Sequence, residues 1–299
     1  MNTESTNAPT PSCLDSVVVS EVVTATPRPE NKIGVYVGVL SVTGKTESEI
    51  FAWREYLSQL SGDPDHPFYY RVGQILNARP AVFAHNVLTE SFLALPEDYM
   101  LIWADDMVPK PSTLALLELI PCDMALLSVH IWSDKDNMPI LTHGIHKEGH
   151  SYEMANIPRK ENPYAITAGG SGGLLIHKRV FEDPRMLISE APSPDLPRTW
   201  WQDLNNVCGN REHGHDLDFT KRATDLGYSL TAHPGAWAGH RKTVDLMDVA
   251  LYVDKYGEKV ANELKDLWLK RLHEVDPRVA ATIENDFEKY GLRLRPVEV

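Results

Sequence analysis

The most constraining feature of this chain is a short apolar segment that ends in two adjacent carboxylates. Residues 99–104 (YMLIWA) form the apolar segment, and Asp105 and Asp106 follow it directly. Two neighbouring acids at the end of a buried strand repel each other and lose solvation, unless they reach the sheet edge, where a cation can hold them. Open α/β sheets bind ligands at this edge, outside the carboxyl ends of their strands. A solvated turn would explain the acids equally well, because Asp is a common turn residue.

Composition predicts a soluble globular protein and argues against several classes. Of 299 residues, 42% are hydrophobic and 24% charged, and the formal net charge is −13, which disfavours a large nucleic-acid surface. Cys13, Cys122 and Cys208 are widely separated, so neither a disulfide framework nor a zinc–cysteine site is expected. Neither an apolar run of about 20 residues nor a secretory signal is present, so we expect a cytoplasmic protein without a membrane span.

Apolar strands and amphipathic helices alternate through much of the chain. This order predicts an α/β fold with a mainly parallel, doubly wound central sheet flanked by helices. Strands are expected at residues 32–42, 68–72, 99–104, 123–131, 174–176 and 228–232, and helices at 75–95 and 112–120. Residues 1–30, rich in Ser, Thr and Pro, predict a disordered or extended tail, and residues 244–299 predict a C-terminal helical extension.

The turn after the first strand is close to a phosphate loop but misses its spacing. Five residues separate Gly38 from Gly44, where the motif requires four, and Val39 occupies the required glycine position. The loop works through backbone amides at fixed offsets, so one residue matters. A phosphate-loop enzyme therefore remains only an alternative, and Lys45-dependent ATP hydrolysis would identify it.

Two further stretches point to ligand contact. Four glycines in residues 169–173 cost backbone entropy beside an apolar strand, which predicts close approach of backbone or ligand. Residues 184–209 form a long connection with the Trp200–Trp201 pair, which is typical of a lid or binding loop. We expect this pair to be an exposed platform for a sugar ring or base, with a plug in an apolar cleft as the alternative.

The stretch HGHDLDFTKRATDLG, residues 213–227, places acids at the start of a predicted helix. N-capping would use one of Asp216 and Asp218 and leave the other spare. A metallohydrolase site made with His213 and His215 fails on spacing, because Asp216 follows the second histidine immediately and Asp218 stands where the final histidine should be.

Three stretches in this order resemble nucleotide-sugar glycosyltransferases of the GT-A fold, especially the family 2-like branch. LIWADDMVP, residues 101–109, preceded by ILNARPAV, is similar to the region of the acidic DXD motif. GGSGGLLIHKRVFE, residues 169–182, resembles the glycine-rich strand and helix of the acceptor half. GHDLDFTKRATDLGYSL, residues 214–230, followed by GAWAGH resembles the Gly-Glu-Asp helix and the late metal-binding histidine. The resemblance implies a GT-A (nucleotide-diphospho-sugar transferase) domain over residues 31–243.

The resemblance also implies a divalent cofactor, Mn²⁺ or Mg²⁺. Asp106 would bind it beside the donor diphosphate, His240 would complete the coordination, and Asp105 would assist the metal or contact the ribose. A hard cation held by carboxylate oxygens can neutralise the charge on a leaving nucleoside diphosphate. Ala104 replaces the frequent first acid of the motif, which affects the expected ribose contacts.

The remaining site assignments follow the two halves of such an enzyme. For the donor nucleotide we assign Ser41, Thr43 and Arg79, the last of which precedes a predicted helix N-terminus that can approach a phosphate. Asp216 would be the base that takes the acceptor proton. The acceptor or sugar would contact Gly170, Gly172, Gly173, Trp200, Trp201 and His215, which replaces the usual glutamate of the motif.

The predicted function is a metal-dependent glycosyltransferase that moves a sugar from a UDP- or GDP-sugar to an acceptor hydroxyl. Inversion is favoured because Asp216 stands at the position of a base. The alternatives are a nucleotidyltransferase or phosphate-loop nucleotide enzyme, and a noncatalytic sugar- or nucleotide-binding module. Glycan, lipid, protein, small-metabolite and hydroxylated-nucleobase acceptors all remain open, and the negative charge counts against duplex DNA.

Overall fold

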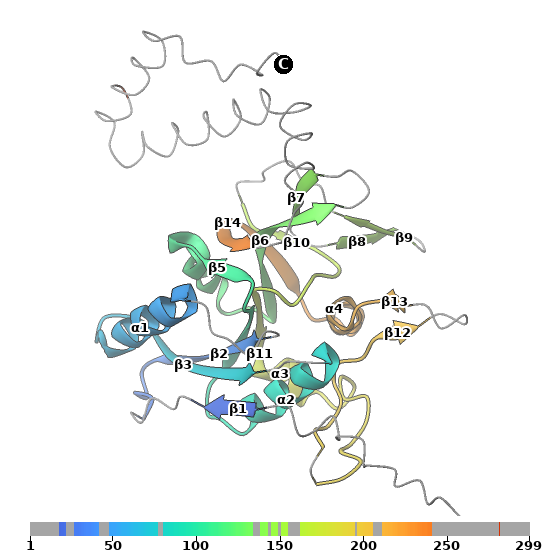
Figure 1. The fold of residues 1–299 in the computed structure, drawn as a ribbon, viewed down its shortest axis with the longest axis horizontal. Coiled ribbons are helices and arrows are strands. Elements are labelled where there is room, and N and C mark those ends of the chain that lie inside the picture. Colours follow the sequence, from blue (N-terminus) through green and yellow to red (C-terminus); the bar gives the residue numbers. More distant parts are fainter. Residues whose placement is uncertain are drawn as a thin grey trace, which may run out of the picture. The chain divides into compact units, whose positions relative to one another are not determined.

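A computed structural model describes residues 18–21, 27–41, 48–76, 80–133, 138–142, 145–148, 151–154, 162–194, 196–205, 211–240 and 281. The chain divides into two compact units, one of residues 1–131 with 140–241 and one of residues 132–139 with 242–299. Of the second unit, residues 132, 133, 138, 139 and 281 are described. The elements that build the candidate site belong to the first unit (Figure 1).

The first unit is built on one mixed sheet with the strand order β1-β3-β2-β4-β11-β6-β14-β10. β2 pairs in parallel with β3 and β4, and β6 pairs in parallel with β14, whereas β11 runs antiparallel to both β4 and β6. Five strands therefore point the same way, and the prediction of a mainly parallel sheet is confirmed. The strand bounds are β1 Val18–Glu21, β2 Ile33–Ser41, β3 Phe68–Leu76, β4 Tyr99–Ala104, β6 Met124–Ser133, β10 Tyr164–Ala165, β11 Leu174–His177 and β14 Leu230–His240.

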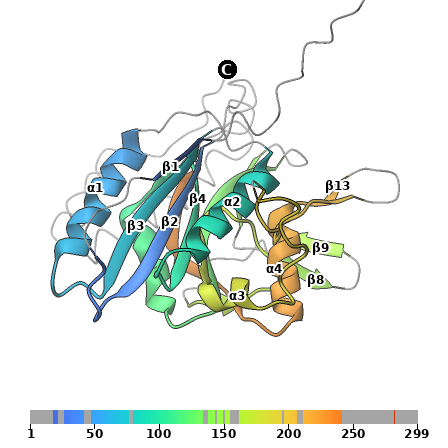
Figure 2. The same cartoon turned by 90° about the horizontal axis from the view of Figure 1, so that it is seen from below.

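Helices cover both faces of this sheet (Figure 2). Helix α1 (Ser48–Gly62) packs on one face, together with the 3₁₀ helix η2 (Pro111–Leu119). Helices α2 (Ala81–Leu93), α3 (Lys178–Glu182) and α4 (His215–Asp225) pack on the other. The smaller strands are β5 Met107–Pro109, β7 Met138–Thr142, β8 Ile145–Glu148, β9 Ser151–Met154, β12 Leu204–Asn205 and β13 Arg211–His213.

The sequence of β2 explains how one strand serves two cores. Successive side chains of a strand point to opposite faces, so Val35, Val37 and Val39 join the α1 core while Tyr36 and Leu40 join the α2 core. Such near-continuous burial is typical of a strand with helices on both faces.

Gly38 lets helix α2 approach β2 closely. A Cβ atom at Gly38 would lie 2.6 Å from the Leu88 side chain of α2. Gly38 therefore has a packing role between the sheet and α2.

Several boundaries differ from the sequence-based expectations. β3 continues to Leu76, and α2 begins only at Ala81, because the end of β3 lies between β2 and the edge strand β1. β1 itself falls within the predicted tail, where its β-branched residues pair with β3. The helix expected at residues 112–120 is the 3₁₀ helix η2, Pro111–Leu119, and the strands β7, β8 and β9 lie where the sequence analysis placed no strand.

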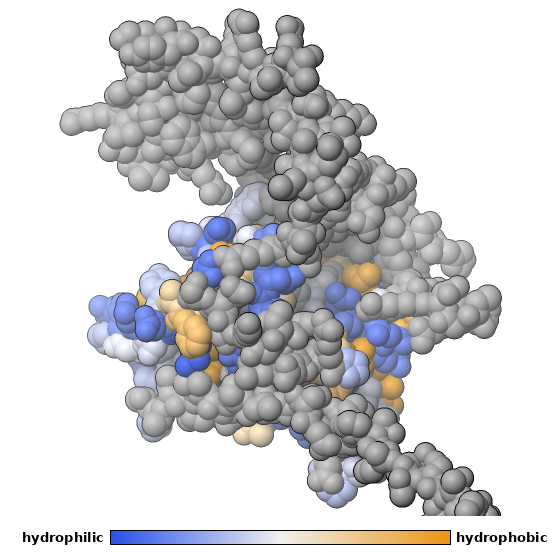
Figure 3. All heavy atoms as spheres, in the orientation of Figure 1, coloured by the Kyte–Doolittle hydropathy of each residue, from blue (hydrophilic) through white to orange (hydrophobic). Residues whose placement is uncertain are grey.

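The described surface visible in Figure 3 mixes hydrophilic residues with scattered hydrophobic ones. Among the described residues, the exposed large hydrophobic side chains are Phe51, Tyr56 and Ile188. In the described part of the chain, no helix is both long enough and apolar enough to cross a membrane.

Candidate functional site

The acid pair lies at the sheet edge where the parallel strands β2 and β4 both end. The Asp105 N–H donates to the Leu40 carbonyl oxygen (3.0 Å), and the Ser41 hydroxyl donates to Asp105 Oδ2 (2.9 Å). The structure thus brings together Ser41 and Asp105, which the sequence assigned separately to the donor. Their contact places the first acid at the carboxyl edge, where open α/β sheets bind ligands.

Strand register brings the second acid to a distant histidine. β5 pairs antiparallel with the end of β14, so that His240 lies opposite Met107, the residue after Asp106. As a result His240 Nε2 lies 3.1 Å from Asp106 Oδ2, although the two residues are 134 positions apart. These are the two residues predicted to hold the metal.

The Asp106–His240 pair has donor atoms that fit a divalent metal. A carboxylate oxygen and an imidazole nitrogen lie 3.1 Å apart here, and both are metal-ligand types. Imidazole is softer than the oxygen ligands that Mg²⁺ prefers, so His240 favours Mn²⁺ over Mg²⁺. Among the described residues no group of three or more His, Cys, Asp or Glu side chains could hold a metal ion.

A cleft of 420 Å³ joins the acid pair to the glycine-rich stretch and to the start of α4. Asp105 and Asp106 lie on its wall, and Ser171, Gly172 and His215 also line it. The remaining lining residues are Leu40, Ala81, His85, Ile102 and Ala104. All three stretches that carry the resemblance thus contribute to one cavity or to its wall.

The glycines beside this cleft are required by close packing. Gly173 has φ +74°, and a Cβ atom there would lie 2.3 Å from Leu127. A Cβ atom at Gly172 would lie 2.7 Å from Met107 Sδ, directly after the acid pair. The prediction of close backbone approach in this stretch is confirmed.

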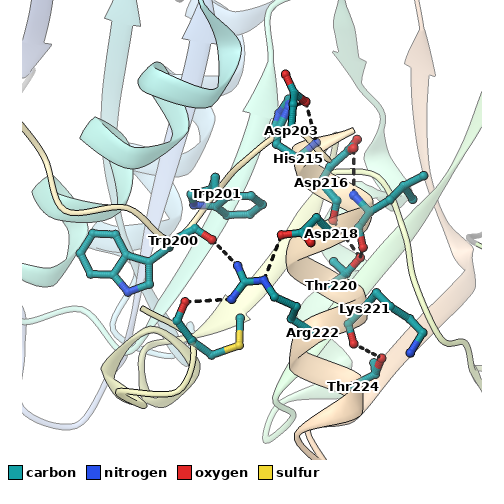
Figure 4. A network of polar contacts seen from close by, with 12 residues as sticks. Trp200, Trp201, Asp203, His215, Asp216, Asp218, Thr220, Lys221, Arg222 and Thr224 are labelled. Carbon is teal, nitrogen blue, oxygen red and sulfur yellow. Dashed lines mark hydrogen bonds and ion pairs between the residues drawn. The ribbon is translucent and has the colours of Figure 1, made fainter. Parts of the chain in front are cut away.

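At the start of α4, Asp216 and Asp218 have different surroundings (Figure 4). Asp218 is buried and bonds Arg222 (2.9 Å), whose guanidinium also donates to the Met186 carbonyl (3.0 Å) and to the Trp200 carbonyl. Asp218 is therefore structural. Asp216 is half-buried and accepts from the Leu217 N–H (2.9 Å).

The Asp216 carboxylate also lies close to Gly170. A Cβ atom at Gly170 would be 3.5 Å from Asp216 Oδ2, an ordinary contact distance. The structure thus brings together the predicted base and one of the glycines predicted to contact the acceptor.

His215 is a buried polar residue on the cleft wall. It is 7% exposed, and neither ring nitrogen has a hydrogen-bond partner among the described residues. Nδ1 lies 3.5 Å from Asp203 Oδ1, within ion-pair range, and the same carboxylate oxygen accepts from the His215 backbone N–H (3.0 Å). Asp203 was not among the predicted site residues.

The prediction of an exposed Trp200–Trp201 platform is wrong, because the two residues are 1% and 0% exposed. Trp200 Nε1 donates to the Phe181 carbonyl (3.0 Å), and the Trp201 ring stacks on Phe219 at 3.9 Å. With their N–H groups paired and their rings in the core, these indoles cannot present a free face to an acceptor. The apolar plug that we kept as the alternative describes them better.

Two polar residues of α2, His85 and Asn86, were missed by the sequence analysis. Asn86 Oδ1 accepts from the backbone N–H groups of Trp200 (2.8 Å) and Trp201 (3.0 Å), and its Nδ2 donates to the Trp201 carbonyl (3.1 Å). The available signal was two adjacent polar residues between the apolar residues of the first two turns, in helical register with Val82 and Phe92.

His85 connects α2 to the glycine-rich stretch. Its Nδ1 lies 2.8 Å from the Ala81 carbonyl oxygen, and its Nε2 lies 3.1 Å from Ser171 Oγ. Burial, reinforced by the nearby His215, lowers the pKa of His85 to about 3. The predicted donor residues Thr43 and Arg79, like Lys45, lie outside the described residues.

The fold and site together define an α/β protein with a mostly parallel sheet and an acidic cleft at its carboxyl edge. No protein-family model and no curated protein matches the sequence. Among solved structures the chain is similar to A197 from STIV, with TM-score 0.41 and 10% identity over 70% of this chain and 86% of that one.

The chain is also similar to GalNAc-T7, solved with UDP, GalNAc and Mn²⁺. The TM-score is 0.39 and the identity 11%, over 77% of this chain and 48% of that one. The chain therefore spans about half the length of that protein. Both likenesses are distant, so the function proposed below rests on the residues of the site.

Proposed function

We propose that this chain is a metal-dependent glycosyltransferase of the GT-A type, which transfers a sugar from a UDP- or GDP-sugar to an acceptor hydroxyl. One observation carries the proposal. Asp106 Oδ2 and His240 Nε2 lie 3.1 Å apart beside a cleft that Asp106 shares with Ser171 and His215. A carboxylate–imidazole pair beside this cleft suits a donor that carries both a diphosphate and a sugar.

The donor half consists of residues at the ends of β2, β4 and β14. Asp106 and His240 would hold Mn²⁺, or less favourably Mg²⁺, which neutralises charge on the leaving diphosphate when bound. Asp105 is fixed by the Ser41 hydroxyl and the Leu40 carbonyl, so it presents an oriented carboxylate on the cleft wall. An oriented carboxylate there can accept hydrogen bonds from the hydroxyls of the donor.

The acceptor half centres on the start of α4. Asp216 would take the proton of the acceptor hydroxyl, a role that typically contributes about 100- to 10,000-fold to the rate. Asp218 is committed to Arg222, which leaves Asp216 as the carboxylate available beside Gly170. This arrangement favours inversion.

His215 adds a second polar group to the acceptor half. Leaving a buried polar atom without a partner costs about 1–3 kcal/mol. A ligand that bonds a ring nitrogen of His215 would recover that cost, which supports the assignment of this residue to the acceptor or sugar.

Nucleotide release tests the proposal. A panel of UDP-, GDP- and CMP-sugars is incubated with and without Mn²⁺, using the native protein, Asp106→Ala and the control Asp65→Ala, which changes an exposed acid in the turn before β3. We expect Mn²⁺-dependent release from one donor, lost in Asp106→Ala and retained in Asp65→Ala. Absence of both release and donor binding across the panel would overturn the proposal. Donor binding without release would instead identify a noncatalytic binding module.

A further inference from the structure

A relay of hydrogen bonds runs from the first turn of α2 to the cleft through His85. The Ala81 carbonyl can only accept, so the 2.8 Å contact requires that His85 Nδ1 carry a proton. In a neutral imidazole with hydrogen on Nδ1, Nε2 is an acceptor. The Ser171 hydroxyl, 3.1 Å from Nε2, must then donate to it.

The surroundings of His85 keep the ring neutral. The ring is buried between the Trp201 ring, with centroids 4.9 Å apart, and the His215 ring, with centroids 4.4 Å apart. Burial and the second histidine lower the pKa of His85, and the Ala81 bond and the more distant Asp203 carboxylate raise it less. With its pKa lowered to about 3, the ring is neutral near pH 7, and the Ala81 carbonyl then sets the direction of the relay.

We propose that Ser171 is a specificity-determining residue whose hydroxyl, with its proton committed to His85, offers the cleft only an acceptor. Its lone pairs select a ligand that places a hydroxyl or amide N–H against it. His85 is the positioning residue. This inference rests on the proposed function, in which the hydroxyl or N–H that meets Ser171 belongs to the sugar of the sugar nucleotide.

The other polar groups of the cleft agree with this selection. The carboxylates of Asp105 and Asp106 can only accept when ionised, and they line the same cavity as Ser171. Most of the remaining cavity wall is apolar, so these few acceptors are the groups that can fix the orientation of a ligand. Each can accept one hydrogen bond from a sugar hydroxyl, and none of them can donate to a carbonyl oxygen or a fluorine atom.

A serine bonded to a histidine is also the arrangement of a nucleophile with its base. Two features argue against that role for Ser171. His85 Nδ1 is bonded to a carbonyl oxygen rather than to a carboxylate that would stabilise an imidazolium. A buried imidazole with a pKa near 3 also takes a proton from a hydroxyl very unfavourably.

The first experiment determines which ring nitrogen of His85 carries hydrogen, in the ligand-free full-length protein. The ¹⁵N chemical shifts of the His85 ring, assigned by comparison with His85→Gln, should show hydrogen on Nδ1 and a lone pair on Nε2 from pH 8 to pH 4.5. Hydrogen on Nε2, or titration of the ring in this range, would overturn the proposal.

The affinity of the native protein is first measured for UDP-glucose, UDP-galactose, UDP-N-acetylglucosamine and GDP-mannose in the presence of Mn²⁺. The affinity is then measured for monodeoxy and deoxyfluoro analogues of the sugar nucleotide that binds. Ser171→Ala should weaken the parent sugar about 3- to 10-fold, and Ser171→Thr should restore binding. At the sugar position that contacts Ser171, the deoxy and the deoxyfluoro analogue should both bind the native protein weakly, because neither hydrogen nor fluorine can donate a hydrogen bond. Their affinity for the native protein should equal the affinity of the parent sugar nucleotide for Ser171→Ala. Full affinity for every fluoro analogue, or a glycosyl adduct on Ser171 in intact-mass spectra, would overturn the proposal.

Different results overturn the two proposals. If no sugar nucleotide binds the native protein, the proposed function is wrong, while the His85 tautomer still shows whether the Ser171 hydroxyl donates to His85. If a donor binds and turns over but is indifferent to Ser171→Ala, the glycosyltransferase stands and the role of Ser171 falls.

Discussion

Replacing Asn86 with alanine should destabilise the protein strongly, because this one side chain holds the Trp200–Trp201 segment against α2. The substitution leaves three buried backbone groups without their partners, namely the N–H groups of Trp200 and Trp201 and the carbonyl of Trp201. Each such group costs about 1–3 kcal/mol. Allowing for partial relaxation, we expect Asn86→Ala to lose about 4 kcal/mol of unfolding free energy, a large share of the roughly 5–15 kcal/mol of a typical domain.

Urea unfolding followed by tryptophan emission and far-UV circular dichroism measures this loss. The matched control is Ser91→Ala on the same helix, where a half-buried hydroxyl donates to the Val87 carbonyl (3.0 Å) within α2. The control should change the unfolding free energy by less than about 0.5 kcal/mol. A loss below about 1 kcal/mol for Asn86→Ala would refute the reasoning, because the three backbone groups would then have found other partners.

Three further predictions concern the site. Ser41→Ala removes one hydrogen bond to Asp105, so it should raise the donor KM about 3- to 10-fold with kcat little changed, as initial rates would show. Asp216→Asn should bind the donor normally by calorimetry yet lower the kcat of transfer about 100- to 10,000-fold, and an unchanged kcat would contradict its role as base. The folded pKa of His85, about 3, lies below the unfolded value of about 6.5. Below pH 6.5 the imidazole therefore binds a proton in the unfolded state but not in the folded state. The free energy of unfolding then falls as the pH drops, by about 1.4 kcal/mol per pH unit from this residue. His85→Gln should remove that part of the slope in urea midpoints between pH 7 and pH 4.5, and an identical slope would contradict the assignment.

The main strands were predictable because apolar periodicity is a local property. The segment Tyr99–Ala104 is β4 with the predicted bounds, and the first strand differs by a single residue at each end. The start of α2 was not predictable from local pattern, because the strand before it is extended by pairing with β1, more than 50 residues earlier.

The site was predictable only in part. Nothing near Asp106 in the sequence indicates that His240 lies beside it, since the contact depends on the register of β5 with β14, and only the family resemblance pointed there. The Trp200–Trp201 pair was placed wrongly, because an aromatic pair reads the same whether it covers a ligand or fills a core. Its burial is decided by Asn86, a partner 115 residues away from Trp201.

The most direct test of the central claim is the affinity for Mn²⁺ in the presence of UDP, measured from the loss of the free-ion signal in electron paramagnetic resonance. The native protein is compared with Asp106→Asn, His240→Ala and the control His66→Ala, which changes a histidine just before the amino end of β3, away from the carboxyl edge. We predict that the native protein and the control bind Mn²⁺ equally, and that each site variant binds it about 10-fold or more weakly. Unchanged Mn²⁺ affinity in both Asp106→Asn and His240→Ala would contradict the account.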